Sequence, residues 1–136
     1  MIEINYIAVL VASVAAFAVG ALWYGPLFGK NWRELMGFSA EATQSMKMTP
    51  VKAMAGGFIS TLILTYVLAH FVTLIGVITV ADALTLGFWI WLGFVATIML
   101  NSVWYENRPL QLYLINASHY LVAILVAALV LSWWPW

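Results

Sequence analysis

The sequence predicts an all-α, polytopic membrane protein: a four-transmembrane-helix bundle with a short amphipathic helical loop between spans 1 and 2. Of its 136 residues, 65% are hydrophobic and 7% are charged, whereas a soluble domain carries about 25% charged residues. The chain also contains four apolar runs, each as long as the roughly 20 helical residues that cross a bilayer. Because a chain of this length cannot bury so much apolar surface in its own core, the surplus is expected to face lipid.

The spans belong to a single integral membrane domain that covers the whole chain, and they are predicted near residues 4–24, 51–75, 83–105 and 109–133. Gly25-Pro26 is expected to end the first span, because proline lacks an amide hydrogen and clashes with the preceding turn. Thr49 is the expected cap of the second span, with Pro50 at its first helical position. Asp82 is the expected cap of the third span.

The basic residues occupy only two of the segments between spans, and they are Lys30, Arg33, Lys47, Lys52 and Arg108. Basic residues near span ends mark the cytoplasmic side of a membrane. We therefore expect a multi-pass protein of the cell inner membrane with both termini outside and loops 25–50 and 105–109 in the cytoplasm. The first apolar run is expected to remain as a span, because Glu3 precedes it where a signal peptide would carry Lys or Arg.

The first loop is long enough to hold structure of its own. Residues 30–36 are predicted to form a short helix that ends at Gly37, since glycine readily adopts the left-handed cap conformation. Ser39 is predicted to cap a second short helix, residues 40–48. Two interpretations of the first short helix stay open: it lies among the lipid headgroups, or it packs on the end of the bundle.

Small residues recur every four positions in the first span, at Ala8, Ala12, Ala16 and Gly20. Helices approach each other closely in membranes through such residues. The stripe indicates either packing inside one bundle or an interface between subunits. Because four helices leave much lateral surface uncovered, a homo-oligomer is also expected.

Polar side chains inside the apolar runs are few, and the candidate cluster is Asn101, Tyr105, Asn116, His119 and Tyr120. The last three lie at i, i+3 and i+4, so they share one helix face. Asn101 and Tyr105 lie in the predicted cytoplasmic half of the third span, and the other three residues lie in the cytoplasmic half of the fourth. If their faces meet, they form either interhelical hydrogen bonds or a binding site for a small molecule, whose identity the sequence does not indicate.

Several functions are disfavoured by the same pattern. The chain has no cysteine and a net charge of zero, so neither a thiolate metal site nor a nucleic-acid surface is expected. His70 and His119 differ in predicted depth by about 12 Å, which disfavours a haem held by both. No nucleophile with a neighbouring base is visible, so we expect no catalytic residues. We also expect no metal and no cofactor, because His119 would hold either one only with ligands from another subunit.

One segment carries a more specific signal: it runs Gly-Ala-Leu-Trp-Tyr-Gly-Pro-Leu-Phe-Gly-Lys-Asn-Trp from Gly20 to Trp32. It resembles the Trp-Tyr-x-Pro…Phe-Gly…Trp signature of a family of small bacterial four-span membrane proteins of unknown function, with one residue fewer between Pro26 and Phe28. The Trp-Leu-Gly-Phe segment at 91–94 and the Glu-x-Arg-Pro turn at 106–109 extend the resemblance. It implies the four-helix architecture and no activity.

The signature residues are interpreted as a loop and interface anchor, namely Trp23, Tyr24, Pro26, Phe28 and Trp32. Amphipathic aromatic rings favour the headgroup level. The alternative is a lid or gate over the polar cluster.

Two functions are consistent with the sequence. The first is a non-enzymatic membrane module that oligomerises or binds a partner. The alternative is a small transporter or channel with a polar site in the cytoplasmic half of helices 3 and 4, although transport of a charged solute would be expected to use a carboxylate near the membrane centre. In both, the lipid bilayer is the surrounding partner.

Overall fold

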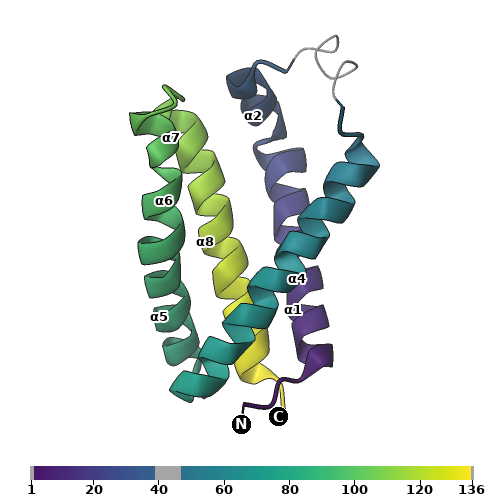
Figure 1. Ribbon diagram of the computed structural model, residues 1–136, viewed down its shortest axis with the longest axis vertical. Helices are drawn as coiled ribbons and strands as arrows, with labels where there is room; N and C mark the ends of the chain where they lie inside the picture. Colours follow the sequence, from purple (N-terminus) through teal and green to yellow (C-terminus); the bar gives the residue numbers. More distant parts are fainter. Residues whose placement is uncertain (1, 39–46, 136) are drawn as a thin grey trace.

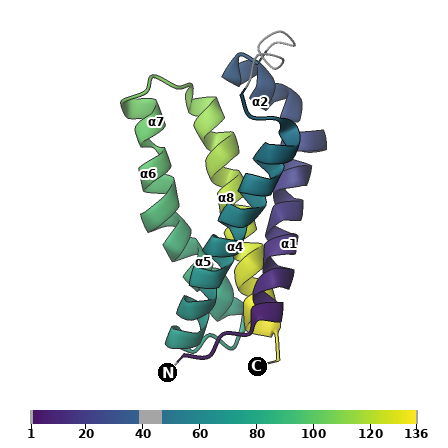
Figure 2. The same ribbon diagram turned by 45° about the vertical axis from the view of Figure 1, so that its right-hand side comes forward.

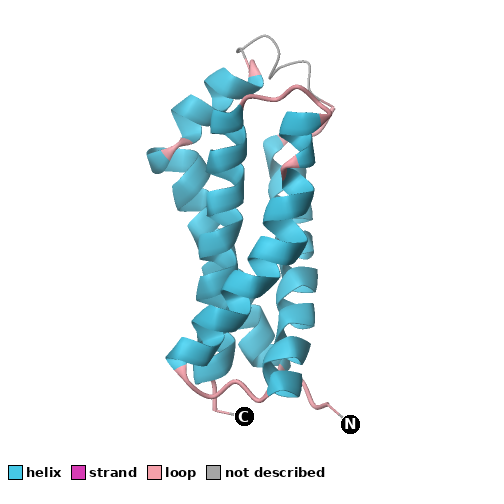
Figure 3. Ribbon diagram, turned by 90° about the vertical axis from the view of Figure 1, so that its left-hand side faces the viewer, coloured by secondary structure: helices cyan, strands magenta, loops and turns pink. Residues whose placement is uncertain are grey.

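The structure is a computed structural model that describes residues 2–38 and 47–135, and its long helices run side by side (Figure 1). Four helices are long and apolar enough to cross a membrane: Tyr6–Leu27, Pro50–Ile75, Val80–Trp104 and Leu110–Trp133. The predicted all-α fold with four spans is therefore confirmed. The two ends of the described chain lie at one end of the bundle, and α2 and the turn between α7 and α8 lie at the other (Figures 1 and 3).

The first span continues through the proline that was predicted to end it. Helix α1 (Tyr6–Leu22) passes into a wider π-helical segment, η1 (Trp23–Leu27), which contains Pro26. The Phe28 N–H donates a hydrogen bond of 2.8 Å to the Trp23 carbonyl, five residues earlier. This wider turn accommodates a residue that has no N–H to donate, so the prediction of a stop at Gly25-Pro26 was wrong.

The chain turns at Phe28, and a short helix, α2 (Gly29–Met36), follows directly. It confirms the predicted helix at residues 30–36. Gly37 ends it in the left-handed conformation, with φ 73°, as expected for a glycine cap. The predicted second short helix, residues 40–48 with its Ser39 cap, falls largely outside the described residues.

The second and third spans begin with threonine caps. At the start of α4 (Pro50–Ile75), the Lys52 N–H donates to the Thr49 hydroxyl oxygen at 3.2 Å, which confirms the predicted cap. Helix α5 (Val80–Trp91) begins three residues before the predicted span. Its cap is Thr79, because the Asp82 N–H donates to the Thr79 hydroxyl at 3.0 Å. Asp82 instead lies in the first turn, where its negative charge interacts favourably with the helix dipole. The prediction that Asp82 is the cap was therefore wrong.

The third span is irregular along its length. Helix α5 leads into a second π-helical segment, η2 (Leu92–Ala96), and then into α6 (Thr97–Met99) and α7 (Asn101–Trp104). These elements follow one another as one bent column (Figure 2). A π turn adds a residue to the helix, and each residue of an α-helix corresponds to a rotation of about 100°. Residues beyond η2 therefore face directions that an uninterrupted helix would not give them.

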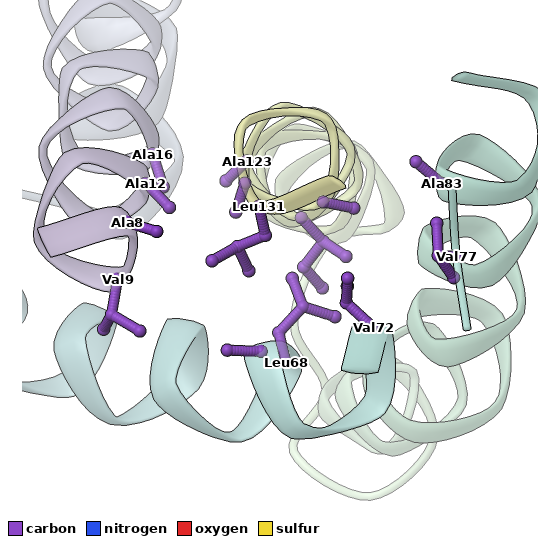
Figure 4. Close-up of a cluster of buried hydrophobic side chains, with 14 residues drawn as sticks. Ala8, Val9, Ala12, Ala16, Leu68, Val72, Val77, Ala83, Ala123 and Leu131 are labelled. Carbon is purple, nitrogen blue, oxygen red and sulfur yellow. The ribbon is translucent and has the colours of Figure 1, made fainter. Parts of the chain in front are cut away.

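The last helix, α8 (Leu110–Trp133), lies at the centre of the packing, with α1 and α5 on either side of it. Ala8, Ala12 and Ala16 of α1 are at most 4% exposed, and they point toward α8 (Figure 4). Leu68 and Val72 of α4 close the same core. The alanine stripe of the first span therefore packs within the bundle, which was the first of the two interpretations of its sequence pattern.

Candidate functional site

The candidate site lies at the end of the bundle that carries α2, where η1, α2, α6 and α8 come together. Its central contact joins the first span to the last: the Tyr24 hydroxyl donates a hydrogen bond of 2.7 Å to Asn116 Oδ1. One residue earlier, the Trp23 indole N–H donates to the Ile115 carbonyl at 3.0 Å. Consecutive residues of η1 thus bond to consecutive residues of α8 and fix the two helix ends together.

The tight turn after η1 depends on a glycine. Gly29 is buried, and a Cβ atom at that position would clash with the carbonyl oxygen of Tyr24. The absence of a side chain lets the first turn of α2 lie directly against η1. Trp32 is thereby brought back over Tyr24, with ring centroids 5.5 Å apart. The glycine in the signature segment therefore serves close packing of backbone on backbone.

His119 lies beside this contact, one helical turn along α8 from Asn116. Its ring is within close range of Gly20: a Cβ atom on that glycine would lie 3.1 Å from His119 Nε2. The rings of Tyr120, Tyr24 and Trp23 surround the imidazole, with centroids at 4.7, 5.0 and 6.5 Å. Among the described residues, His119 Nδ1 is the one buried side-chain nitrogen or oxygen without a hydrogen-bond partner.

An open pocket of about 400 Å³ adjoins these residues. Three aromatic rings, two thioethers and one amide line it, contributed by Tyr24, Trp32, Met36, Met99, Asn116 and Tyr120. The lining comes from η1, α2, α6 and α8, so it exists only when four separate segments are assembled. Its chemistry is that of ring faces, polarisable sulfur and a few hydrogen-bonding groups.

The structure brings together part of the predicted cluster. Asn116, His119 and Tyr120 share one face of α8, as their spacing required, and two of them line the pocket. Asn101 is exposed, and Tyr105 is 85% exposed. Met99 takes the place that Asn101 was expected to occupy. The third span is not one continuous α-helix here: η2 is followed by the short helices α6, which holds Met99, and α7, which begins at Asn101.

The predicted interface anchors behave differently from one another. Trp23 and Tyr24 are half-buried and turn toward α8, so they are not simple headgroup anchors. Phe28 packs on the Trp23 ring, with centroids 5.2 Å apart, and Trp32 covers the pocket wall. Pro26 lies within η1 and is exposed. This arrangement agrees with the interpretation that the loop packs back onto the bundle end.

His70 lies apart from this site, on α4. Its Nδ1 is 2.9 Å from the Tyr66 carbonyl oxygen, and its ring contacts the Tyr66 ring. The contacts that the His70 side chain makes are therefore within its own helix.

A larger hollow, of about 640 Å³, lies at the end of the bundle where the chain termini are, between residues 2–5 and the end of α4. Its Asn5 and Thr73 groups are already used, the first as the cap of α1 and the second in a bond to the Ala69 carbonyl.

Sequence reasoning missed several polar contacts that hold the helices together. The Trp91 indole N–H donates to the Ala117 carbonyl at 2.8 Å, and the Tyr113 hydroxyl donates to the Ala96 carbonyl at 3.0 Å. Deeper in the bundle, the fully buried hydroxyls of Ser13 and Thr65 bond to each other across α1 and α4. The available signal was the position of Trp91 near the middle of a span, where an interface anchor would not lie.

These features define a class: a helical multi-pass membrane protein with an aromatic pocket at one end. The chain belongs to the family described as protein of unknown function DUF1761, whose model matches residues 7–132. The predicted membership of a family of unknown function is thus confirmed over residues 7–132. No match was found among curated proteins or among solved structures.

Proposed function

We propose that this protein is a non-enzymatic, membrane-embedded binding module that receives a small ligand in the pocket between η1, α2, α6 and α8. The observation that carries this proposal is the pocket itself, an open space of about 400 Å³ walled by side chains from four segments. Small-molecule sites are commonly concave, largely apolar and equipped with a few polar groups, and they occur between helices of bundles. The chain's pocket is open and shallow, its lining is largely apolar with a few polar groups, and it lies between helices of a bundle.

The geometry favours binding over the alternative of a transporter or channel. Between the pocket and the terminal end, the interior is filled by side chains such as Ala12, Ala127, Ile124 and Leu131, each at most 1% exposed. The buried hydroxyls of Ser13 and Thr65 bond to each other and to carbonyls of their own helices. A solute leaving the pocket in this direction would meet a packed apolar core, so conduction would require the helices to separate.

We further propose that the pocket faces the cytoplasm from the inner membrane, with both termini outside. Lys30 and Arg33 belong to α2, Lys47 lies just before α4 and Lys52 in its first turn, and Arg108 belongs to the turn between α7 and α8. These segments lie at one end of the bundle (Figure 1), and basic residues favour the cytoplasmic side. Association with further copies of the chain stays a prediction. Its support is an uncovered small-residue face on the first half of α4, which includes Ala53, Gly56 and Ser60.

The absence of cysteine from the chain permits a direct test. Met99→Cys places a thiol in the pocket wall, and Met48→Cys places one at a position that is 58% exposed at the same end of the molecule. A small water-soluble maleimide is applied to the protein in micelles, alone and with a set of neutral, anionic and cationic aromatic compounds. We expect at least one compound to slow labelling of Cys at position 99 without affecting the control.

Ala127→Cys supplies the opposite control, because Ala127 is 0% exposed in the core. Labelling of the pocket variant no faster than this core variant would contradict the proposal, since the pocket would then be closed. The proposal would also fail if no compound of the set slowed labelling at the pocket. Flux of the protecting compound into vesicles containing the protein would instead favour the transporter.

A further inference from the structure

We propose that the preferred ligand is a weakly hydrated organic cation of the quaternary ammonium class, bound against the ring faces of Tyr24, Trp32 and Tyr120. This inference rests on the proposed binding function and specifies its ligand. The three residues line one pocket, yet they come from η1, α2 and α8. Quaternary ammonium groups are recognised by cages of aromatic faces, which attract positive charge through the ring quadrupole.

The rings are held at steep angles to one another. Tyr24 meets Trp32 at an interplanar angle of 67° and His119 at 62°. His119 in turn meets Tyr120 at 61°. The hydrogen bond from Tyr24 to Asn116 fixes the Tyr24 ring, which contacts both Trp32 and His119. The rings of Tyr24 and Trp32, which both line the pocket, are therefore far from parallel, so they wall the space from two directions, whereas stacked rings would leave room only for a flat ligand.

The polar groups of the pocket do not suit an anion. Its lining includes neither lysine nor arginine, and Lys30 and Arg33 of α2 are exposed. Tyr24 already donates its hydroxyl hydrogen to Asn116. The remaining side-chain donors are therefore the Asn116 amide, the Tyr120 hydroxyl and the Trp32 indole N–H, and none of them carries a positive charge. Removing an anion from water without sufficient donors is costly. Solvent screens the charges of the exposed Lys30 and Arg33, so these residues attract an anion in the pocket only weakly.

A strongly hydrated cation is also disfavoured. Metal ions and primary ammonium groups need carboxylate or several neutral oxygen ligands to replace their water, and the lining includes no aspartate or glutamate. A quaternary ammonium spreads its charge over methyl groups and donates no hydrogen bonds. The thioethers of Met36 and Met99 supply the polarisable, apolar surface that such methyl groups contact.

The test compares a cation with its neutral isostere. Benzyltrimethylammonium and neopentylbenzene have the same shape, because a carbon atom replaces the charged nitrogen. Each is titrated against the protein in maltoside micelles, both by calorimetry with the unmodified chain and by protection of Cys in the Met99→Cys variant. We expect the cation to bind about tenfold more tightly than the isostere.

Variants then assign this preference to the rings. Trp32→Leu and Tyr120→Leu should each weaken cation binding about tenfold and leave isostere binding nearly unchanged, whereas Trp32→Phe should retain most of the affinity. Trp104→Leu is the matched control, since Trp104 is 67% exposed at the same end of the bundle and does not line the pocket. Thermal unfolding of each variant verifies that the fold is intact.

Equal binding of the cation and the isostere would overturn the inference while leaving the binding module standing. So would protection by an anionic or neutral compound when benzyltrimethylammonium has no effect. If neither these probes nor any other compound protected the pocket thiol, the proposed function itself would fail.

Discussion

Tyr24 and Asn116, which are separated by 92 positions in the chain, are joined by a hydrogen bond of 2.7 Å between phenol and amide oxygen. The bond ties the end of the first span to the first half of the last span, and it lies beside the pocket. Within hydrocarbon, a polar side chain finds its partner on another helix or stays unsatisfied. This pair therefore couples the stability of the bundle to the shape of the candidate site.

Removal of either partner should destabilise the protein. We expect Tyr24→Phe and Asn116→Leu each to lower the free energy of unfolding by about 1 kcal/mol, with a non-additive double variant, because both remove the same bond. Reversible unfolding in mixed micelles measures these values. Tyr105→Phe is the control, since that residue is 85% exposed. Strict additivity would show that the bond contributes nothing.

Gly20 and His119 form a second coupled pair. Gly20→Ala places a methyl group 3.1 Å from His119 Nε2, closer than ordinary contact, so the imidazole must move. We expect a loss of about 1 kcal/mol that disappears when the substitution is made in a His119→Ala background. The comparison uses the same unfolding measurement. An equal loss in both backgrounds would mean that the histidine ring is not the obstacle.

His119→Phe keeps a ring of similar size and removes the buried, unpartnered Nδ1. Because an unsatisfied buried nitrogen costs free energy, we expect this variant to be as stable as the original chain, or more stable by about 1 kcal/mol. Asn116→Leu, in contrast, should be less stable than the original chain. A large loss of stability in His119→Phe would indicate that Nδ1 has a partner in the membrane.

The buried hydroxyl pair of Ser13 and Thr65 should contribute to helix association. Thr65→Val is nearly isosteric and leaves the Ser13 hydroxyl without its partner on α4. We expect a loss of about 1 kcal/mol, measured by unfolding in micelles. Thr85→Val is the matched control, because the Thr85 hydroxyl bonds only to the Ala81 carbonyl of its own helix in an exposed position.

Orientation can be read from single cysteines in a chain that has none of its own. Ile78, in the turn before α5, is 82% exposed. Glu106 lies in the turn between α7 and α8, at the end of the bundle that carries α2 (Figure 1). A membrane-impermeant maleimide added to intact cells should label Ile78→Cys, and Glu106→Cys should react only after the membrane is opened. The reverse pattern would contradict the proposed topology.

Helix positions were predictable because they follow from apolar length and from local capping chemistry. Thr49 and Gly37 act as caps through their own side chain or conformation, which a single sequence reveals. The π-helical segments η1 and η2 were not predictable. Pro26 signals an irregular turn in η1 but not its π-helical form, and residues such as Leu92 and Gly93 carry no local signal for a wider turn.

The difference between local signals and tertiary packing also explains why only part of the site was predicted. Asn116, His119 and Tyr120 lie on one regular helix, so their shared face followed from spacing alone. The partner face required knowledge of tertiary packing. It comes from Tyr24, which lies within η1 at the end of the first span, and from Met99, which follows η2 on the third.

The central position of α8 has a consequence for assembly during synthesis. Helices α1 and α5 pack chiefly on α8, and the indole groups of Trp23 and Trp91 bond to its carbonyls at Ile115 and Ala117. Of the helices described, α8 is the last to leave the ribosome. The first and second spans can pair as soon as both are made, through contacts such as the Ser13–Thr65 bond, whereas the third span packs chiefly on α8 and has lipid as its neighbour until that last helix arrives.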